Sequence, residues 1–416
     1  MSLQHKEKLP FSINQRIIFS VSILFLALLP FNIGKILTDD LSYAHGRYIN
    51  YFQTRITLLF LVGLILVGSV FLNNLIQKKN RKSIVALFCL IISLVIWNLY
   101  LSSSVPAFII TSTIQLMQFV VVSMGTIIAL AVVSKDIAKG ESGDFSRFGK
   151  YILAGVTGLQ VLLQSLQILN TGPIFPSLLK FLGQPIYFDS FSQFGEWTLH
   201  RGYGTAAHPN ILGGVFLVYV AVFLTQKNRT LIDWITITLL SLGILLTFSR
   251  ATIAVLIIFI VIYMTKYLPR ISDLSHISLK NTVTVVLGFT TGVCLLLSDF
   301  FSQLPLIPYF LSSRIALLKS ASALFLLFPT GTGFGLLIER SIHNALTPII
   351  SGRLLLEPVH NSILLPIVEL GLLGSLLLLF LYYFLLRKTS LTKSDIWIYL
   401  VVIVTVIGAF DHFLIY

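Results

Sequence analysis

Charged residues are scarce in this sequence. Asp, Glu, Lys and Arg together make up 11% of the 416 residues, whereas 56% are hydrophobic. A soluble domain carries about 25% charge, and a single core surrounded by water cannot enclose so much apolar surface in a chain of this length. The composition therefore excludes a soluble enzyme, a disordered chain and a coiled coil. It predicts a protein whose solvent is lipid.

Cysteines and metal-binding motifs are nearly absent as well. Cys89 and Cys294 both lie inside apolar runs, so we interpret them as small hydrophobic residues that form neither a disulfide framework nor a thiolate metal site. The carboxylates are scattered, with no pair at ligand spacing, and we predict no metal and no other cofactor. The glycine-rich run 331–335 lacks the Lys-Ser/Thr pair of a nucleotide-binding loop and is interpreted as a tight turn.

Long apolar runs dominate the sequence instead. They continue unbroken for about 15 to 25 residues, the length that spans a bilayer as a helix, and they do not alternate as strands of an outer-membrane barrel do. We predict an all-α, multi-pass fold that forms a single integral membrane domain over residues 1–416. No small-residue cleavage site follows the first run, which we interpret as a retained anchor. The predicted spans lie at about 17–37, 56–76, 83–101, 107–133, 151–169, 205–225, 231–248, 251–267, 281–298, 361–386 and 396–410.

The basic residues predict the orientation of these spans. With the N-terminus in the cytoplasm, 19 of the 29 Lys and Arg residues fall in cytoplasmic segments, which is the bias expected of that side. The net charge of +13 is thus explained by topology and by contact with lipid head groups, and a nucleic-acid partner is not expected. The 19 residues are Lys6, Lys8, Arg16, Lys78, Lys79, Arg81, Lys82, Lys135, Lys139, Arg147, Lys150, Lys227, Arg229, Lys266, Arg270, Lys280, Arg387, Lys388 and Lys393.

Two long loops are predicted on the extracytoplasmic side, at about 170–204 and 299–360. Long loops are uncommon unless they are functional. The second contains an apolar segment, 314–328, that is too short to span comfortably. We expect an amphipathic helix at the membrane surface, with Ser312 or Ser313 as its N-cap.

Four short polar segments are predicted on the outer side, each at or just before the start of a helix. They are 201–210 (RGYGTAAHPN), 247–250 (TFSR), 312–314 (SSR) and 359–361 (VHN). Helix N-termini carry unpaired N–H groups and a partial positive charge. Arginine adds a planar fork that matches phosphate oxygens. Together the segments predict an anion site suited to a phosphate or pyrophosphate.

Each of these residues also has a simpler interpretation. Arg201 could anchor its loop to lipid phosphates, and Arg314 could extend its charge from an interfacial helix toward water. His208 precedes Pro209, which suits the first position of a helix, so a capping role is favoured over catalysis. Arg250 follows an apolar helix almost without a loop, and a charge at that depth favours a function.

His360 is placed to act as a general base. The dipole of the predicted helix 361–386 disfavours the imidazolium at its start, and a neutral imidazole can accept a proton. Gly371 and Gly374 follow about three and four turns later, so they form a small-residue stripe below the histidine that admits another helix or a lipid chain. Glu369 is expected on the opposite face, paired with a polar group of another helix.

With these residues the chain resembles the bacterial O-antigen ligase and O-antigen polymerase superfamily. Its hallmark is His-[Asn/Ser/Gln], nine residues, then Gly-x-x-[Gly/Thr/Tyr], which His360-Asn361 and Gly371-Leu-Leu-Gly374 match. The R-x-x-G-T-x-x-H-P-N stretch, the T-x-S-R helix start and the S-x-R…P-x-G-x-G-x-G loop are similar to the same family. The resemblance covers about residues 200–386, and it implies a GT-C-like bundle of usually about twelve helices, whereas this chain ends after the eleventh.

The resemblance implies a glycosyltransferase of the bacterial inner membrane whose donor is a glycan on undecaprenyl pyrophosphate. His360 would be the general base, Arg250 and Arg314 would stabilise the pyrophosphate, and Arg201, His208, Asn361, Gly371 and Gly374 would be supporting contacts. The reaction would invert the anomeric carbon without metal or nucleotide. A lipid A core acceptor would make the enzyme a ligase, and a second lipid-linked unit would make it a polymerase. A non-enzymatic flippase of the same lipid-linked glycan is the alternative from another class. It should carry charged or polar residues through the bilayer depth, whereas the middle of the predicted spans is nearly free of charge here and the polar groups gather on one face.

Overall fold

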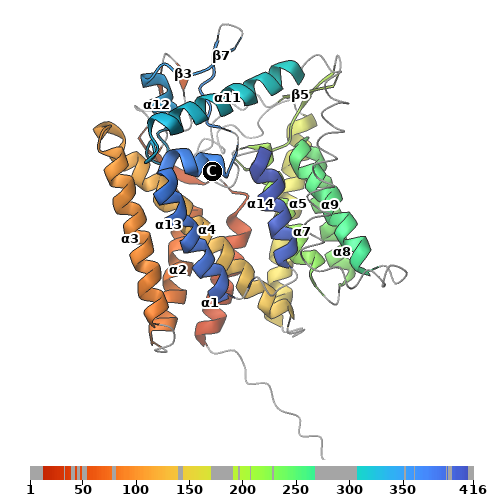
Figure 1. Cartoon of the computed structure of the whole chain (residues 1–416). Helices are drawn as coiled ribbons and strands as arrows, with labels where there is room; N and C mark the ends of the chain where they lie inside the picture. The colour runs from red at the N-terminus through yellow and green to blue at the C-terminus, as the bar shows by residue number, and fades with distance from the viewer. Residues whose placement is uncertain are drawn as a thin grey trace, which may run out of the picture.

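The fold was analysed in a computed structural model of the chain (Figure 1). The following paragraphs concern the residues that the structure describes. These are 13–31, 33–38, 43–44, 47–48, 54–76, 81–138, 144–169, 191–194, 197–206, 208–226, 229–267, 307–350, 353–359, 361–389, 391 and 396–410.

Long helices make up most of the described chain, as the apolar runs predict. Ten of the eleven predicted spans coincide with a helix, and the other, 281–298, lies outside the described residues. These ten helices are α1 (Ile13–Leu28), α2 (Leu58–Ile76), α3 (Arg81–Ser102), α4 (Ile109–Ala138), α5 (Asp144–Leu169), α7 (Pro209–Leu224), α8 (Leu231–Leu246), α9 (Arg250–Tyr267), α13 (Leu364–Thr389) and α14 (Ile396–Phe410).

Helix length and composition identify a membrane protein. Within the described ranges, four helices are long and apolar enough to cross a bilayer, namely α3, α4, α5 and α13. The other six are apolar but shorter, with 10–17 residues in the described part. Many outward-facing side chains are large and apolar, for example Ile65, Leu162 and Leu379 at 57%, 56% and 64% exposure. Such a surface is stable in lipid, and the chain is therefore a mostly helical membrane protein.

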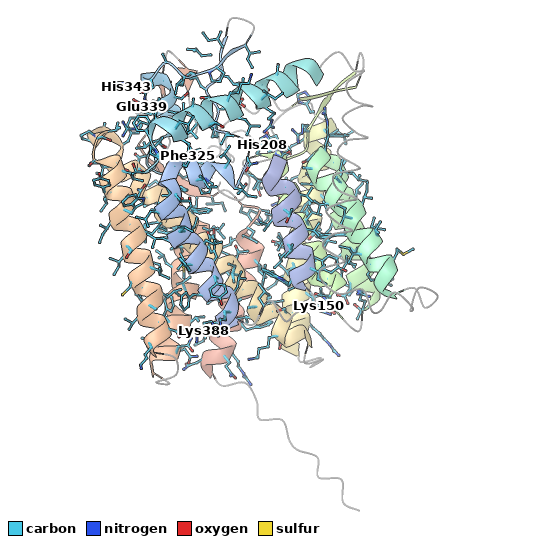
Figure 2. The ribbon with its side chains drawn as sticks, in the orientation of Figure 1. Lys150, His208, Phe325, Glu339, His343 and Lys388 are labelled. Carbon is cyan, nitrogen blue, oxygen red and sulfur yellow. The ribbon has the colours of Figure 1, made fainter. Side chains whose placement is uncertain are left out.

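The helices stand roughly side by side and define two ends of the bundle (Figures 1 and 2). His208, Glu339 and His343 lie at one end, which we call the His208 end, whereas Lys150 and Lys388 lie at the other (Figure 2). The predicted topology likewise places the first three residues on one side of the membrane and the two lysines on the other. Which side of the membrane each end faces stays a prediction.

Close contacts between helices depend on small residues. α1 packs against α2 and α4, α5 against α8, and α13 against α3. A Cβ added at Gly125 of α4 would lie 2.8 Å from the ring of the fully buried Phe25 of α1, and one added at Gly63 of α2 would lie 3.2 Å from the same ring. Glycine therefore makes room for the phenylalanine where three helices meet, because close packing drives helix association in lipid.

A helix is present in the second predicted long loop and is longer than expected, while its position at the membrane surface stays a prediction. α11 (Ile307–Leu327) crosses the His208 end of the bundle, from the side of strand β5 to the side of the short helix α12 (Leu337–His343) (Figure 1). Leu317, Ala321 and Leu324 form its buried face at helical spacing. The predicted caps, Ser312 and Ser313, are wrong, since both lie inside the helix. Pro308 is tolerated near the start because the first-turn amides have no helical partner anyway.

Short hairpins join several helices and were not predicted. The antiparallel pairs are β1 (Gly34–Thr38) with β4 (Thr54–Thr57), β2 (Tyr43–Ala44) with β3 (Arg47–Tyr48), β5 (Phe191–Phe194) with β6 (Trp197–His200), and β7 (Ile349–Ile350) with β8 (Arg353–Leu354). The short 3-10 helix η3 (Pro106–Phe108) precedes α4. The predicted first span, 17–37, is too long at its end, because α1 stops at Leu28, just before Pro30, and strand β1 begins at Gly34.

Candidate functional site

Arg201 joins the first two predicted segments directly. Its Nε donates to the backbone carbonyl of Thr247 at 2.8 Å, and its Nη2 donates to Oδ1 of Asn210 at 2.6 Å. The guanidinium therefore connects the turn between α8 and α9 to the start of α7. This internal contact is a third role for Arg201, beside the lipid anchor and the anion ligand that the sequence suggested.

His208 is the N-cap of α7, as the sequence favoured. Its backbone is extended, with φ −154° and ψ 146°, and its Nδ1 accepts a hydrogen bond from the amide of Asn210 at 3.2 Å. Pro209 occupies the first helical position, where its missing N–H has no cost. His208 and Asn210 thus fix the helix start that Arg201 contacts.

The 247–250 segment is a tight turn that places Arg250 at the start of α9. Phe248 adopts a left-handed backbone with φ 48°, and the amide of Ser249 donates to the hydroxyl oxygen of Thr247 at 3.2 Å. The Ser249 carbonyl then accepts the first helical bond, from Ile253 at 3.0 Å. The side chain of Arg250 is exposed. The predicted helix start with an arginine is therefore confirmed, and a positive charge lies beside the unpaired amides of the first turn.

Three buried glutamines of α5 hold the loop 202–205 and were not predicted. Gln160 exchanges hydrogen bonds with Thr205, at 2.6 Å to its hydroxyl and 2.9 Å from its amide. Gln167 accepts from the amides of Tyr203 and Gly204 and donates to the Gly204 carbonyl at 2.8 Å. Gln164 contacts the loop through the Gly202 carbonyl. The polar groups of the loop 202–205 are thus hydrogen-bonded by side chains of α5 and not by a neighbouring strand.

The same loop carries a neutral aromatic side chain. Burial raises the pKa of the Tyr203 hydroxyl above its ordinary value, because the charged phenolate would lose its hydration. The hydroxyl, which is uncharged at neutral pH even at its ordinary pKa, is thus kept neutral over a wider range of pH.

A second loop of the His208 end, residues 329–336, packs against an interruption in α13, and we call it the glycine loop. Gly331, Gly333 and Gly335 have positive φ values of 112°, 98° and 75°, which confirms the predicted turn-rich run. The amide of Thr332 donates to the Val368 carbonyl at 3.0 Å, and the amide of Gly333 donates to the Glu369 carbonyl at 2.8 Å. The loop therefore occupies carbonyls that a continuous helix would use itself.

Gly371 is the point where α13 is interrupted. Its φ of 66° and ψ of −178° are not helical, and a Cβ there would lie 2.1 Å from the Thr330 carbonyl oxygen. The predicted face shared by His360, Gly371 and Gly374 on one straight helix is therefore wrong, because the helix begins at Leu364 and kinks at Gly371.

Gly374 admits the neighbouring helix, as expected of a small residue. A Cβ there would lie 2.9 Å from the Trp97 ring of α3, and the Trp97 Nε1 donates to the Leu370 carbonyl at 2.8 Å.

Glu369 pairs with polar groups outside α13, as expected, and two of these groups belong to the main chain of the loop 329–336 and of α12. The side chain is fully buried, and the backbone N–H groups of Gly335 and Leu337 donate to its carboxyl group. Leu337 begins α12, so this carboxyl group lies at the start of that helix. Glu369 therefore fixes the glycine loop from inside the bundle, beside the Val368 and Glu369 carbonyls that fix it from the backbone.

Asn361 caps α13, and His360 lies outside the described residues. The Asn361 Oδ1 accepts from the amides of Ile363 and Leu364 at 3.0 and 2.8 Å. The amide of Ser362 donates to the Gly408 carbonyl at 2.7 Å, which places this segment beside the end of α14. The predicted helix start thus lies at Leu364, three residues later than expected, and the role of His360 stays a prediction.

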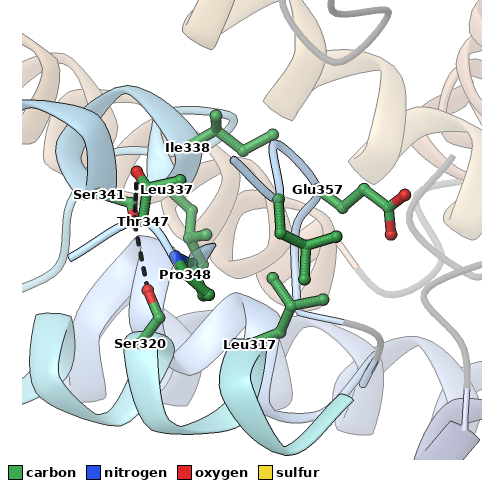
Figure 3. A pocket seen from close by; sticks show the side chains of 9 residues that line it. Leu317, Ser320, Leu337, Ile338, Ser341, Thr347, Pro348 and Glu357 are labelled. Carbon is green, nitrogen blue, oxygen red and sulfur yellow. Dashed lines mark hydrogen bonds between the residues drawn. The ribbon is translucent and has the colours of Figure 1, made fainter. Parts of the chain in front are cut away.

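Arg314 lies two turns inside α11 and not at its start. The argument from an unpaired helix N-terminus therefore does not apply to it, and its predicted role depends on its charge alone. Near α11, a pocket of about 10 Å³ opens between α11, α12 and the residues that flank the strand pair β7–β8, with room for about one water molecule (Figure 3). Ser341 connects its walls, through hydroxyl contacts with Ser320 at 3.1 Å and Thr347 at 3.3 Å.

Arg340 is a further cation of the His208 end that the sequence did not single out. Its guanidinium donates to the Ser104 hydroxyl and to the Thr332 carbonyl at 3.5 Å, and it lies 5.3 Å from the centre of the Phe328 ring. Burial lowers the pKa of this guanidinium, and the neighbouring Glu339 carboxylate opposes that shift. Its contacts assign it to the glycine loop.

The structure thus joins two of the four predicted segments, 201–210 and 247–250, through the hydrogen bonds of Arg201 to Asn210 and Thr247. Gly371 packs separately, against the loop 329–336. Across the residues that the structure describes, no group of three or more His, Cys, Asp and Glu side chains is arranged to hold a metal ion. Comparisons with protein-family models, curated proteins and solved structures find no match to this chain.

Proposed function

We propose that this protein is a glycosyltransferase that moves a glycan from undecaprenyl pyrophosphate to an acceptor hydroxyl at the outer face of a bacterial inner membrane. In this proposal the chain is an O-antigen ligase-like protein with a GT-C-like bundle, and the His208 end is its extracytoplasmic face. The motif around His360 suggests the family, and the geometry of the arginines supports the chemistry.

The observation that carries the proposal is the contact of Arg201 with the 247–250 turn. Through the Thr247 carbonyl and Asn210, this one side chain holds the starts of α7 and α9 together. Two helix N-termini, each with its partial positive charge, and the guanidinium of Arg250 therefore lie in one region. Such an arrangement favours a dianion, and a lipid-linked pyrophosphate is the dianion that a membrane protein meets at the bilayer surface.

The proposed chemistry is a single displacement. The acceptor hydroxyl gives its proton to His360, and its oxygen attacks the anomeric carbon as the bond to the pyrophosphate oxygen breaks. The configuration at that carbon is inverted. Arg250 and Arg314 would stabilise the charge that develops on the leaving pyrophosphate, so the step needs no general acid. Arg201 would contribute by positioning the turn that leads to Arg250.

The experiment is a reconstituted transfer assay. The purified full chain in lipid nanodiscs is given a defined undecaprenyl-pyrophosphate glycan, together with either a lipid A core or a second lipid-linked unit. Extension of the lipid A core supports the ligase, whereas extension of the second unit supports the polymerase. Release of undecaprenyl pyrophosphate must accompany either product.

The transporter alternative is tested in the same membranes. A flippase would move a fluorescent lipid-linked glycan between the leaflets of a vesicle without forming a new glycosidic bond. Translocation without product in the presence of both acceptors would refute the proposed transferase.

A further inference from the structure

Gln164 of α5 contacts both arginine-bearing segments at once. The side chain is fully buried, and its Nε2 donates to the Gly202 carbonyl and to the Gly243 carbonyl, both at 3.1 Å. An amide nitrogen carries two hydrogens, so each carbonyl can receive one. Gln164 therefore links the loop 202–205 to the last turn of α8.

Both contacts lie close to an arginine. Gly202 is the neighbour of Arg201, and its amide donates to the Leu246 carbonyl at 3.0 Å. The Gly243 carbonyl also accepts from the amide of Thr247, at 3.2 Å, and the Thr247 carbonyl in turn receives the guanidinium of Arg201. The side chain of Gln164 thus completes a closed set of contacts between α5, the loop and the turn that precedes Arg250.

The three segments approach too closely for a larger side chain at either glycine. A Cβ at Gly202 would lie 2.8 Å from the Cβ of Gln164, and a Cβ at Gly243 would lie 3.1 Å from its Oε1 and 2.3 Å from the ring of Phe216. In an apolar helix a leucine would fill the same volume without the cost of burying an amide. The buried amide nitrogen is therefore explained by the two carbonyls to which it donates.

We infer that Gln164 is a positioning residue for the pyrophosphate, acting through Arg201 and Arg250. This inference rests on the proposed function, and it adds a residue on α5 that neither the motifs nor the family resemblance includes. Gln164 touches no substrate. It fixes the distance between the Arg201 loop and the last turn of α8. That turn leads through residues 247–249 to Arg250 at the start of α9.

The test compares Gln164→Leu with the matched control Thr157→Val. Thr157 is also fully buried on α5, but its hydroxyl donates only within the helix, to the Leu153 carbonyl at 2.8 Å. The full chain in nanodiscs is titrated with undecaprenyl pyrophosphate. We expect Gln164→Leu to weaken binding by about 10- to 100-fold, the effect of a displacement of about 1 Å at a charge-binding group, and Thr157→Val to leave it unchanged. Unchanged binding in Gln164→Leu would overturn the inference.

A double-substitution cycle separates positioning from a general loss of structure. If Gln164 acts through Arg250, then Gln164→Leu should weaken binding much less in an Arg250→Lys background than in the wild type. Independent, multiplying effects would contradict the inference, even if both single variants bind poorly.

Hydrogen exchange gives a readout that does not depend on the substrate. We expect Gln164→Leu to accelerate exchange of the amides in 201–206 and 247–249 together, with both segments unchanged in Thr157→Val. Faster exchange in only one segment, or in neither, would refute the link through Gln164. If the two segments loosen together while the wild type shows no affinity for undecaprenyl pyrophosphate, the proposed function fails and the structural link holds, but the pyrophosphate role of Gln164 fails with the function.

Discussion

Substitution of Gly371 by alanine tests the interruption of α13. The φ of 66° and ψ of −178° fall in a region that is essentially restricted to glycine, and a non-glycine residue there costs about 1–3 kcal/mol. The new Cβ would also lie 2.1 Å from the Thr330 oxygen and 2.2 Å from the Thr330 carbonyl carbon, both backbone atoms that no rotamer change can move. Crowding of this kind costs about 1–3 kcal/mol more.

The two effects together predict that the free energy of unfolding falls by about 2–6 kcal/mol. This is a large part of the total, which is typically about 5–15 kcal/mol. The midpoint of thermal unfolding in nanodiscs should therefore fall sharply. Trp97 gives a local signal, since its indole N–H donates to the Leu370 carbonyl beside the kink. We expect its fluorescence to change in the folded state of Gly371→Ala, because the carbonyl must shift.

Gly155→Ala is the matched control. Gly155 lies within a regular stretch of α5, and a Cβ there meets no heavy atom within 4 Å. Alanine should be neutral or more stable by about 0.5–1 kcal/mol. If Gly371→Ala unfolded at the wild-type temperature, residue 371 would belong to a continuous helix and the assignment of the loop to the Val368 and Glu369 carbonyls would be wrong.

Three further predictions concern the proposed chemistry and the opposite end. His360→Ala should abolish glycan transfer, since no base remains for the acceptor, while insertion into the membrane is unchanged; full turnover in the reconstituted assay would remove His360 as the base. Arg250→Lys should lower kcat/KM about tenfold, because a point charge cannot replace a planar fork, and wild-type kinetics would leave Arg250 a structural role. Asp233→Ala should cost about 1–2 kcal/mol in thermal unfolding, because it removes the capping box of α8 and the 3.4 Å partner of Lys150; an unchanged midpoint would contradict this.

The sequence predicted the helices well where its signal was long or specific. Apolar runs located ten helices, and Pro209 marked the start of α7. The start of α11 was missed because Ser312 and Ser313 resemble caps, while the residues that extend the helix, 307–311, are apolar and compatible with either reading. The end of α1 was missed because hydrophobicity continues past Pro30, although the proline prevents a regular helix there.

The kink of α13 could not be predicted from its own sequence. Gly371 and Gly374 fit a straight helix as well as a broken one, and the choice depends on the loop 329–336, which precedes α13 by some thirty residues. Only the packed structure shows that the loop takes the helix carbonyls.

The glutamines of α5, by contrast, left a signal that was available. Gln160, Gln164 and Gln167 repeat at intervals of four and three residues in an apolar helix, so they lie on one face, and buried amides need partners. That spacing predicts a polar backbone segment beside α5. Identifying the segment as the Arg201 loop required the structure, because no spacing rule connects residues about 40 positions apart.

The contact between the glycine loop and α13 has a consequence for biosynthesis. α3 and its Trp97 leave the ribosome first, and the glycine loop follows more than 200 residues later. The carbonyls that both contact belong to α13, which is made after them. Because translation proceeds from the N-terminus, this junction cannot close until α13, the last of the three elements, has been made. A nascent chain halted before residue 364 would carry the loop without its partner, and translocon-bound intermediates should expose it to proteases until α13 is released into the bilayer.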